Sequence, residues 1–177
     1  MPLIQTVSPQ DAQGKVKEVY DQVSAAFGAP PNALQIYSAS PALLAEHWQS
    51  IGYYMQHPTL NFALLAMMRM LVSQQGHCEY CVGFNESLLI NHAGFSIEQV
   101  QAAKRDPASA PLPPKDVAML LFTLKAARDS NSVTATDIDA LRKAGWSDAD
   151  ILDGLNHAAN MLAADMLLNA LKVENDF

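Results

Sequence analysis

Two cysteines, Cys78 and Cys81, lie two residues apart and are the only cysteines in this chain. A Cys-x-x-Cys pair can close a small disulfide ring reversibly, which is redox chemistry. If the pair opens a helix, the unpaired backbone N–H groups and the helix dipole at that end favour a thiolate over a thiol. Helical geometry also places Cys78, Cys81 and Asn85 on one face, so that both sulfurs can face one pocket.

Polar residues flank the cysteine pair and are candidates for auxiliary roles. His77 is the best local candidate for a base. Asn85 could orient a water or a peroxide, and Tyr80 could donate a hydrogen bond to a sulfur, although an aromatic residue at this position is also typical of simple packing. We interpret Glu79 and Glu86 as residues of a solvated face or a helix cap.

Spacing argues against several uses of the pair. A c-type haem attachment requires a His directly after the second cysteine, and that residue is Val82. Structural zinc requires four ligands, and the nearest histidines, His77 and His92, do not complete a recognisable set. A thioredoxin-like domain would place the pair after a strand, and none is indicated. Two interpretations stay open, a helical thiol oxidoreductase or two buried cysteines that only pack, and we predict neither a metal nor a cofactor.

The elements that must position the pair are all helical in pattern. We predict an N-terminal helical extension over about residues 8–57, whose first helix has Ser8 as N-cap, Pro9 at its first position and Asp11 in capping-box spacing, and runs to about Phe27. A second helix follows Ser40. Residues 61–75 are apolar around nearly the whole circumference except at Arg69, so this helix must be buried on more than one side, by the chain itself and by a second subunit.

The helix that carries the cysteines should begin near Cys78 and end about His92. Further helices are expected from Ser96 to before Asp106 and over residues 115–128, about 134–145 and 148–173. No stretch shows sustained strand alternation, so the predicted class is all-α, with residues 1–177 forming a single domain. His157 and the methionines of the buried helical faces are interpreted as core: Met67, Met68, Met70, Met161 and Met166.

Charge and hydropathy exclude some partners. The formal net charge is -7 and the pI is about 5.0, which argues against nucleic acid and anionic membranes as partners. The apolar runs are interrupted by Arg69, Lys125 or Asp165, so no membrane-spanning segment is expected. The first residues show no secretory signal pattern, and we expect a cytoplasmic protein.

The segment from Leu71 to Val82, with its Cys-Glu-Tyr-Cys core, and the following helix that ends in His92-Ala-Gly-Phe-Ser resemble the carboxymuconolactone decarboxylase family in its alkyl hydroperoxidase D (AhpD) branch. The similarity covers a redox core of about residues 60–100. It implies an AhpD-like helical bundle that assembles as a homotrimer or hexamer. It also implies that Cys81 attacks the oxidant and that Cys78, the more exposed partner, exchanges with a reductant.

Members of the peroxidase branch carry a Glu twelve positions before the first cysteine and a His four positions after the second, which form a proton relay. Those positions are Ala66 and Asn85 here, and neither can take a proton. We therefore expect disulfide exchange or weak reduction of organic hydroperoxides, with a dithiol or a lipoyl- or thioredoxin-like protein as reductant. The alternative is a non-enzymatic redox-sensing or scaffold oligomer. Lactone decarboxylation needs acid–base groups and no thiols, and has little support.

Overall fold

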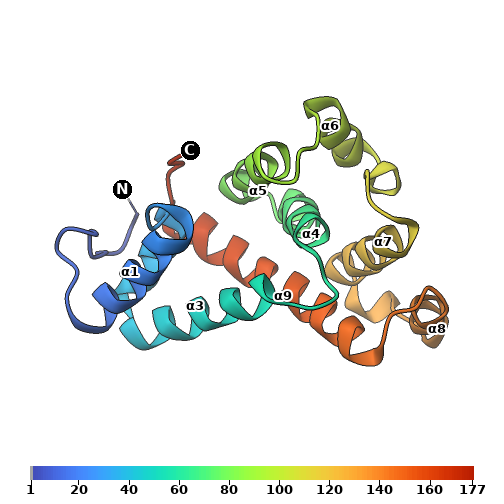
Figure 1. Ribbon diagram of the computed structural model, residues 1–177, viewed down its shortest axis with the longest axis horizontal. Helices are drawn as coiled ribbons and strands as arrows, with labels where there is room; N and C mark the ends of the chain where they lie inside the picture. The colour runs from blue at the N-terminus through green and yellow to red at the C-terminus, as the bar shows by residue number, and fades with distance from the viewer. Residues whose placement is uncertain (1) are drawn as a thin grey trace. The chain divides into compact units, whose positions relative to one another are not determined.

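The computed structural model describes residues 2–177, in which every regular element is helical and no strand is present (Figure 1). The predicted all-α class is therefore confirmed. The α-helices are α1 (Gly14–Phe27), α2 (Asn32–Gln35), α3 (Pro41–Met55), α4 (Phe62–Gln75), α5 (Glu79–Asn91), α6 (Ile97–Arg105), α7 (Pro114–Arg128), α8 (Ala135–Lys143) and α9 (Asp148–Leu171). Three short 3-10 turns connect them: η1 (Ile36–Ala39), η2 (Pro107–Ser109) and η3 (Ser130–Ser132).

The chain divides into two compact units. The first contains the residues up to His57 together with Leu168–Phe177, and the second is Pro58–Leu167. The boundary at His57 falls where the predicted N-terminal extension ends. The second unit contains both cysteines and all the auxiliary candidates, so it carries the site. That the chain behaves as a single domain stays a prediction.

In the first unit, α1 packs against α3 through its buried face, which includes Val19 and Val23. The predicted start of this helix is wrong: α1 begins at Gly14. Ser8 and Asp11 instead close a turn, in which the Asp11 N–H donates to Ser8 O at 3.1 Å and Ser8 Oγ donates to the Asp11 carboxylate at 2.7 Å. Ser and Asp bond locally in turns as readily as in caps, and Pro suits the second position of a turn.

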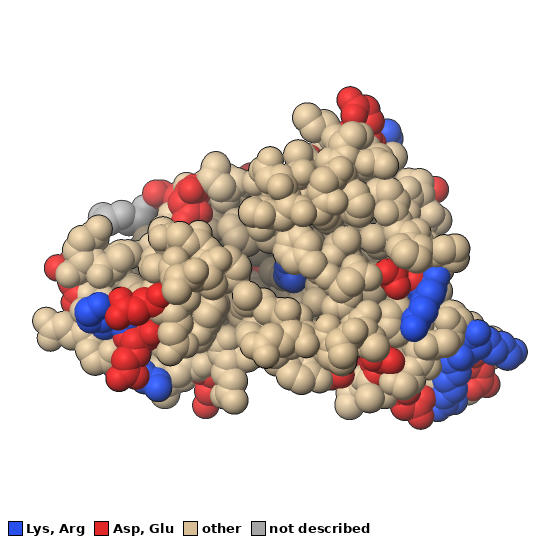
Figure 2. All heavy atoms as spheres, viewed as in Figure 1, with Lys and Arg blue, Asp and Glu red and all other residues tan. Residues whose placement is uncertain are grey.

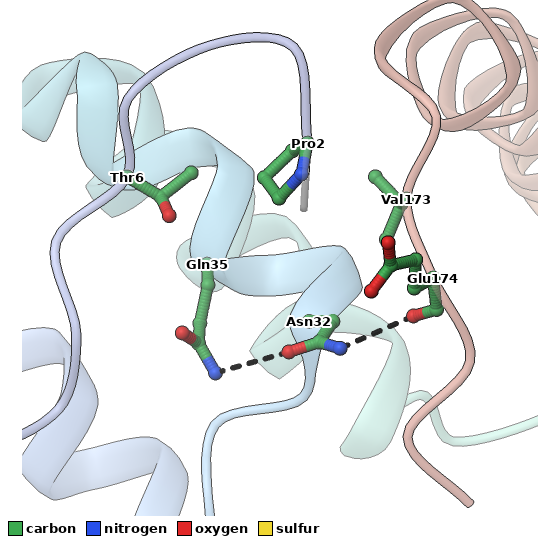
Figure 3. Close-up of a pocket in the computed structure, with 6 residues that line it drawn as sticks. All are labelled: Pro2, Thr6, Asn32, Gln35, Val173 and Glu174. Atoms are coloured by element: carbon green, nitrogen blue, oxygen red, sulfur yellow. Dashed lines mark hydrogen bonds between the residues drawn. The ribbon is translucent and has the colours of Figure 1, made fainter.

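A small pocket of about 150 Å³ lies beside α2 in the same unit (Figure 3). Asn32 donates from its side chain to Glu174 O at 3.1 Å and from its backbone to the Asp176 carboxylate at 2.6 Å. These bonds attach the C-terminal segment to α2. The pocket is lined by Pro2, Thr6, Asn32, Gln35, Val173 and Glu174.

In the second unit, α4 is the central helix and packs against α5 and α7. Asn61 caps it by accepting a hydrogen bond from the Leu64 N–H at 3.0 Å. The predicted burial on more than one side is confirmed, but the chain itself provides it, so this helix does not require a second subunit. Its buried residues are Leu64, Leu65, Ala66, Met67, Met68, Met70, Leu71, Val72 and Ser73.

Charged side chains of both signs share the surface. Figure 2 shows basic and acidic groups together at the right of the view, over α8. There Arg142 pairs with Asp139 at 3.0 Å and with Asp148 at 2.8 Å. Among the helices described, none is both long enough and apolar enough to cross a membrane.

Candidate functional site

The cysteine pair lies where α4 ends and α5 begins. Gly76 ends α4, His77 has a left-handed backbone with φ 53°, and the Cys78 N–H donates to Ser73 O at 3.0 Å. Cys78 is the N-cap of α5, and its sulfur accepts a hydrogen bond from the Cys81 N–H at 3.4 Å. The pair therefore opens a helix, which is the position that favours a thiolate.

Both cysteines are free thiols and both are buried, with 1% of Cys78 and 3% of Cys81 exposed. Both cysteines are shielded from solvent to nearly the same extent, so the structure shows no exposed partner in the pair. Hydrogen bonds from the Cys81 thiol and from the Cys81 backbone N–H lower the pKa of Cys78. The pKa of Cys81 is raised, because its thiol donates a hydrogen bond to Cys78 and because the side chain is buried. The hydrogen bond that the Cys78 sulfur accepts at the start of α5 thus favours a thiolate on Cys78.

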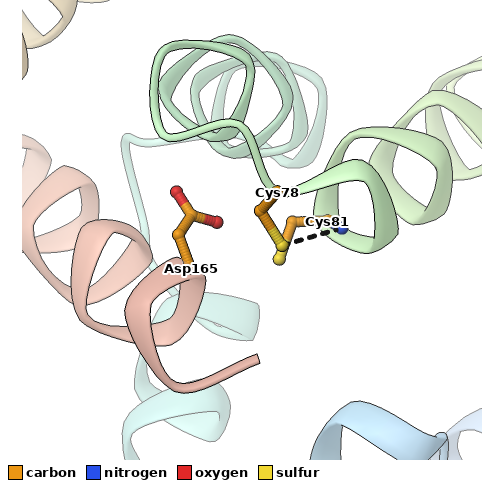
Figure 4. Close-up of side chains that lie close together, drawn as sticks. All are labelled: Cys78, Cys81 and Asp165. Carbon is orange, nitrogen blue, oxygen red and sulfur yellow. Dashed lines mark hydrogen bonds between the residues drawn. The ribbon is translucent and has the colours of Figure 1, made fainter. Parts of the chain in front are cut away.

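Asp165, from α9, faces the pair across the site (Figure 4). One carboxylate oxygen and the two sulfurs lie within 4.8 Å of one another, and only 2% of Asp165 is exposed. Its Oδ1 accepts a hydrogen bond from Ser73 Oγ at 2.7 Å, and its Oδ2 has no hydrogen-bond partner among residues 2–177. Burial raises the pKa of this carboxyl, and the hydrogen bond from Ser73 and the nearby thiols partly offset the shift. Asp165 is thus a buried group that can hold a proton beside the sulfurs.

The close approach of Asp165 depends on Gly76. A Cβ at Gly76 would lie 2.6 Å from Asp165 Oδ2, well inside van der Waals contact. The backbone of Gly76 has φ -78°, which any residue can adopt, so the requirement for glycine is one of space. In the sequence, Asp165 is recognisable only as an interruption of an apolar run. A single carboxylate within an otherwise apolar helix was the one sequence feature that could have marked Asp165 as a site residue.

A second polar cluster adjoins the pair through Asn85. The Asn85 side chain donates to Cys81 O at 2.8 Å and accepts from Arg69 Nε at 2.6 Å. Arg69 Nη1 lies 3.3 Å from His157 Nε2. Asn85 and His157 are buried, as expected of a core histidine, and burial lowers the pKa of Arg69 to about 10. Both groups of the Asn85 amide are therefore engaged in positioning Arg69 against α5.

The other flanking residues differ in their exposure and contacts. His77 is exposed, whereas both sulfurs are buried, so Asp165 is the titratable side chain that adjoins the sulfurs. Tyr80 is buried and stacks on Phe84 with ring centroids 6.2 Å apart. Glu86 pairs with Lys104 of α6 at 2.9 Å, and Glu79 lies exposed in the first turn of α5.

The same three residues form the one group in the described part of the chain that could hold a metal ion: Cys78, Cys81 and Asp165. Two thiolates and one carboxylate suit a soft divalent cation such as Zn²⁺. Structural zinc sites have four protein ligands, and among residues 2–177 no fourth joins this group. The set is therefore unlike a structural zinc site, and it leaves the thiols open to redox chemistry.

No family model matches the sequence, and no curated protein matches it. Solved structures do match. The AhpD core of an uncharacterized peroxidase-related protein from Ralstonia eutropha JMP134 is 19% identical, with 99% of this chain and 92% of that chain covered and a TM-score of 0.86. An uncharacterized peroxidase-related protein from Silicibacter sp. TM1040 is 20% identical, with coverages of 90% and 84% and a TM-score of 0.81.

A cysteine-to-alanine variant of the debrominase Bmp8, in complex with 2,3,4-tribromopyrrole, is 15% identical to this chain. The match covers 98% of this chain and 91% of that chain, with a TM-score of 0.81. At these identities the likeness concerns the fold. It extends over nearly the whole chain, beyond the redox core from which the resemblance was drawn. The protein therefore has the AhpD-like all-helical fold.

Proposed function

We propose that this protein is a thiol oxidoreductase that reduces organic hydroperoxides or disulfides through Cys78 and Cys81. The observation that carries the proposal is a buried dithiol at a helix N-terminus with a proton-holding carboxyl, Asp165, within 4.8 Å. Asp165 supplies a proton-transfer group where Ala66 and Asn85 cannot. The AhpD-like fold supports the same reaction class.

Reduction of a hydroperoxide balances with these groups alone and an external dithiol. The Cys78 thiolate attacks the terminal peroxide oxygen, the O–O bond breaks, and a sulfenic acid forms. The departing alkoxide takes the proton of Asp165 and leaves as an alcohol. The Cys81 thiol then attacks the sulfenic sulfur, releasing water and closing the disulfide. A dithiol or a protein reductant reopens the disulfide and returns the two protons.

We assign the attack to Cys78, in place of the Cys81 role that the resemblance implies. The reason is that Cys78 accepts the helix N–H and the hydrogen bond of its partner, which stabilise its thiolate. Cys81→Ser should then accumulate a sulfenic acid on Cys78 that a dimedone-type reagent traps. Trapping at Cys81 in Cys78→Ser, and not the reverse, would return the attack to Cys81.

The test of the function is the rate at which the reduced protein loses its thiols to an organic hydroperoxide, followed by turnover with a dithiol. The parent should react faster than free cysteine and regenerate repeatedly, and each Cys→Ser variant should fail to turn over. A parent no faster than free cysteine overturns the peroxidase branch of the proposal. A single oxidation without turnover would instead favour the redox-sensing alternative.

A second candidate is reductive dehalogenation, which the likeness to a debrominase supports over 98% of this chain. The same dithiol can supply the two electrons: the carbon–bromine bond of an aryl bromide is replaced by carbon–hydrogen, bromide leaves with a proton, and Cys78 and Cys81 become a disulfide. Bromide release from 2,3,4-tribromopyrrole under reducing conditions tests it. No release above that of the double Cys→Ser variant would dismiss it.

We also propose that the chain forms a homo-oligomer, a trimer or a hexamer, in the cytoplasm. An apolar stripe along α9 supports self-association, and its residues Leu152 and Met166 are 66% and 67% exposed. The stripe consists of Leu152, Leu155, Ala159, Leu162 and Met166. Because Met166 is exposed, the prediction that it is a core residue is wrong. A reduced, working dithiol suits a reducing compartment.

A further inference from the structure

Arg69 is a cation held in a polar cluster that contains no counter-charge. Its two hydrogen-bonding contacts are with the Asn85 amide oxygen at 2.6 Å and the His157 ring at 3.3 Å. Among residues 2–177, no carboxylate forms an ion pair with it, and its Nη2 makes no hydrogen bond. Arg142, by contrast, is paired with two aspartates.

A guanidinium in such surroundings is costly to the fold. The Arg69 side chain is half-buried, and losing part of its hydration without an opposite charge disfavours the charged form, so that burial lowers the pKa of Arg69 to about 10. The group still carries its charge at neutral pH. The Asn85 amide fixes the Nε edge, so the guanidinium is held in place while its Nη2 donor is left available. A planar guanidinium of this kind binds carboxylates through parallel N–H donors.

The cluster lies next to the reactive pair. Asn85, which holds Arg69, also donates to Cys81 O at 2.8 Å. Cys81 and Asn85 are four residues apart on one face of α5, which corresponds to about 5–6 Å between their Cβ atoms. Arg69, Asn85 and Cys81 therefore form one chain of contacts, which places the guanidinium beside the helix that carries the dithiol.

We propose that Arg69 binds the carboxylate of an anionic organic substrate whose reducible bond is separated from that carboxylate by at least one helical turn. The inference rests on the proposed function for the reacting end of the molecule. It narrows the substrate class to organic acids that carry a hydroperoxide or disulfide, and disfavours small neutral hydroperoxides. Binding of the carboxylate supplies the negative charge that the Arg69 cluster lacks.

Equilibrium binding of unreactive probes tests the anion site apart from any turnover. Octanoate and octan-1-ol differ only in the charged end, and their affinities are compared by calorimetry for the parent, Arg69→Gln and Arg69→Lys. Octanoate should bind the parent about tenfold more tightly than octan-1-ol, and Arg69→Gln should lose that preference. Arg69→Lys should keep part of it. Arg142→Gln, which removes an exposed and paired arginine, is the matched control and should behave as the parent.

Equal affinities of the two probes for the parent would overturn the proposal, and this measurement needs no variant. Undiminished octanoate binding by a folded Arg69→Gln protein would overturn it as well. If octanoate binds through Arg69 but thiol oxidation by hydroperoxides stays at the rate of free cysteine, the proposed function fails and the anion site stands. If both hold, KM for a carboxylate-bearing hydroperoxide should rise in Arg69→Gln while KM for a neutral one stays unchanged.

Discussion

Asp165 is the proposed proton donor in place of the Glu/His relay that this chain lacks. This role predicts a specific change in the dependence of the oxidation rate on pH. In Asp165→Asn the oxidation rate at its plateau should fall about a hundredfold, because no acid protonates the departing alkoxide. The midpoint of the profile should move to lower pH, because the Asp165 carboxyl raises the pKa of Cys78 and the amide does not. Stopped-flow measurement of thiol oxidation across pH gives both quantities.

Asp148→Asn is the matched control, since it makes the same change on the same helix at an exposed residue. Its profile should match that of the parent. A lower plateau in Asp165→Asn with an unmoved midpoint would indicate a packing defect and not proton transfer.

The same carboxyl predicts how stability depends on pH. Burial raises the pKa of Asp165 above 3.8, so the native state keeps this proton after the unfolded state has lost it. The free energy of unfolding should therefore fall as pH rises from 3.8 through the raised pKa, relative to Asp165→Asn, which has no proton to lose. Denaturant unfolding of both proteins under reducing conditions measures the difference. A difference that is constant with pH would contradict the shift.

Gly76 supplies the space that Asp165 occupies, so Gly76→Ala should destabilise the protein by about 1–3 kcal/mol, as overpacking does. Gly52→Ala is the control: no atom lies within 4 Å of a Cβ there, and it should stabilise α3 by about 0.5–1 kcal/mol. Urea unfolding measures both. In an Asp165→Ala background the cost of Gly76→Ala should shrink, because the clashing carboxyl is gone. An unchanged cost there would show that Asp165 is not the obstacle.

At the residue scale, the sequence predicts arrangements of residues that lie close together along the chain. The spacing of Cys78 and Cys81 and their place at a helix start follow from four consecutive positions. Asp165 is 84 positions after Cys81 (165 − 81), and Arg69 meets His157 from a different helix. Such pairings depend on how helices pack, which periodicity within one helix does not encode.

The start of α5 makes a separate prediction about helix stability, because Cys78 is also its N-cap. Ser is a strong N-cap and Ala is a poor one, so Cys78→Ser should preserve stability whereas Cys78→Ala should lose about 1 kcal/mol. Thermal unfolding of both variants with reductant present makes the comparison. Equal stabilities would mean that the cap contact at 3.4 Å contributes nothing measurable.

Helix boundaries were predictable wherever a cap had a single interpretation. Ser96 with Gln99 forms the expected capping box of α6, and Asn61 to Gln75 spans the expected buried helix. Ser8 and Asp11 had two interpretations, a cap and a turn, and the turn prevailed because α1 starts at Gly14. The four-residue α2 was missed, since so short a helix has no periodic pattern to detect.

At the scale of the whole molecule, the predicted oligomer was first argued from the apolar helix over residues 61–75, which was expected to need a second subunit for its burial. The structure buries this helix within one chain, so that argument no longer applies. The core helix α4 packs against α5 and α7, so its burial needs no partner, and of its apolar residues Phe62, at its first position, is 46% exposed. The remaining reason lies on α9. Its residues 152, 155, 159, 162 and 166 repeat at helical spacing on one side, and the stripe comprises Leu152, Leu155, Ala159, Leu162 and Met166. Exposed apolar stripes of this kind are typical of protein interfaces.

If this stripe joins copies of the chain, a charge within it should dissociate them, because burying an unpaired carboxylate at an interface is costly. The parent should sediment as a trimer or hexamer, and the double variant Leu152→Glu/Met166→Glu should sediment as a monomer with its helical content unchanged. Asn160→Glu adds the same charge to an exposed position of α9 outside the stripe and should leave the assembly intact. A monomeric parent would refute self-association, and an oligomeric double variant would place the interface elsewhere. Because Asp165 is buried within its own chain, with 2% exposed, whereas Leu152 and Met166 are about two-thirds exposed, assembly through the stripe should not cover or rearrange Asp165, so the monomeric variant should react with hydroperoxide at the parent's rate.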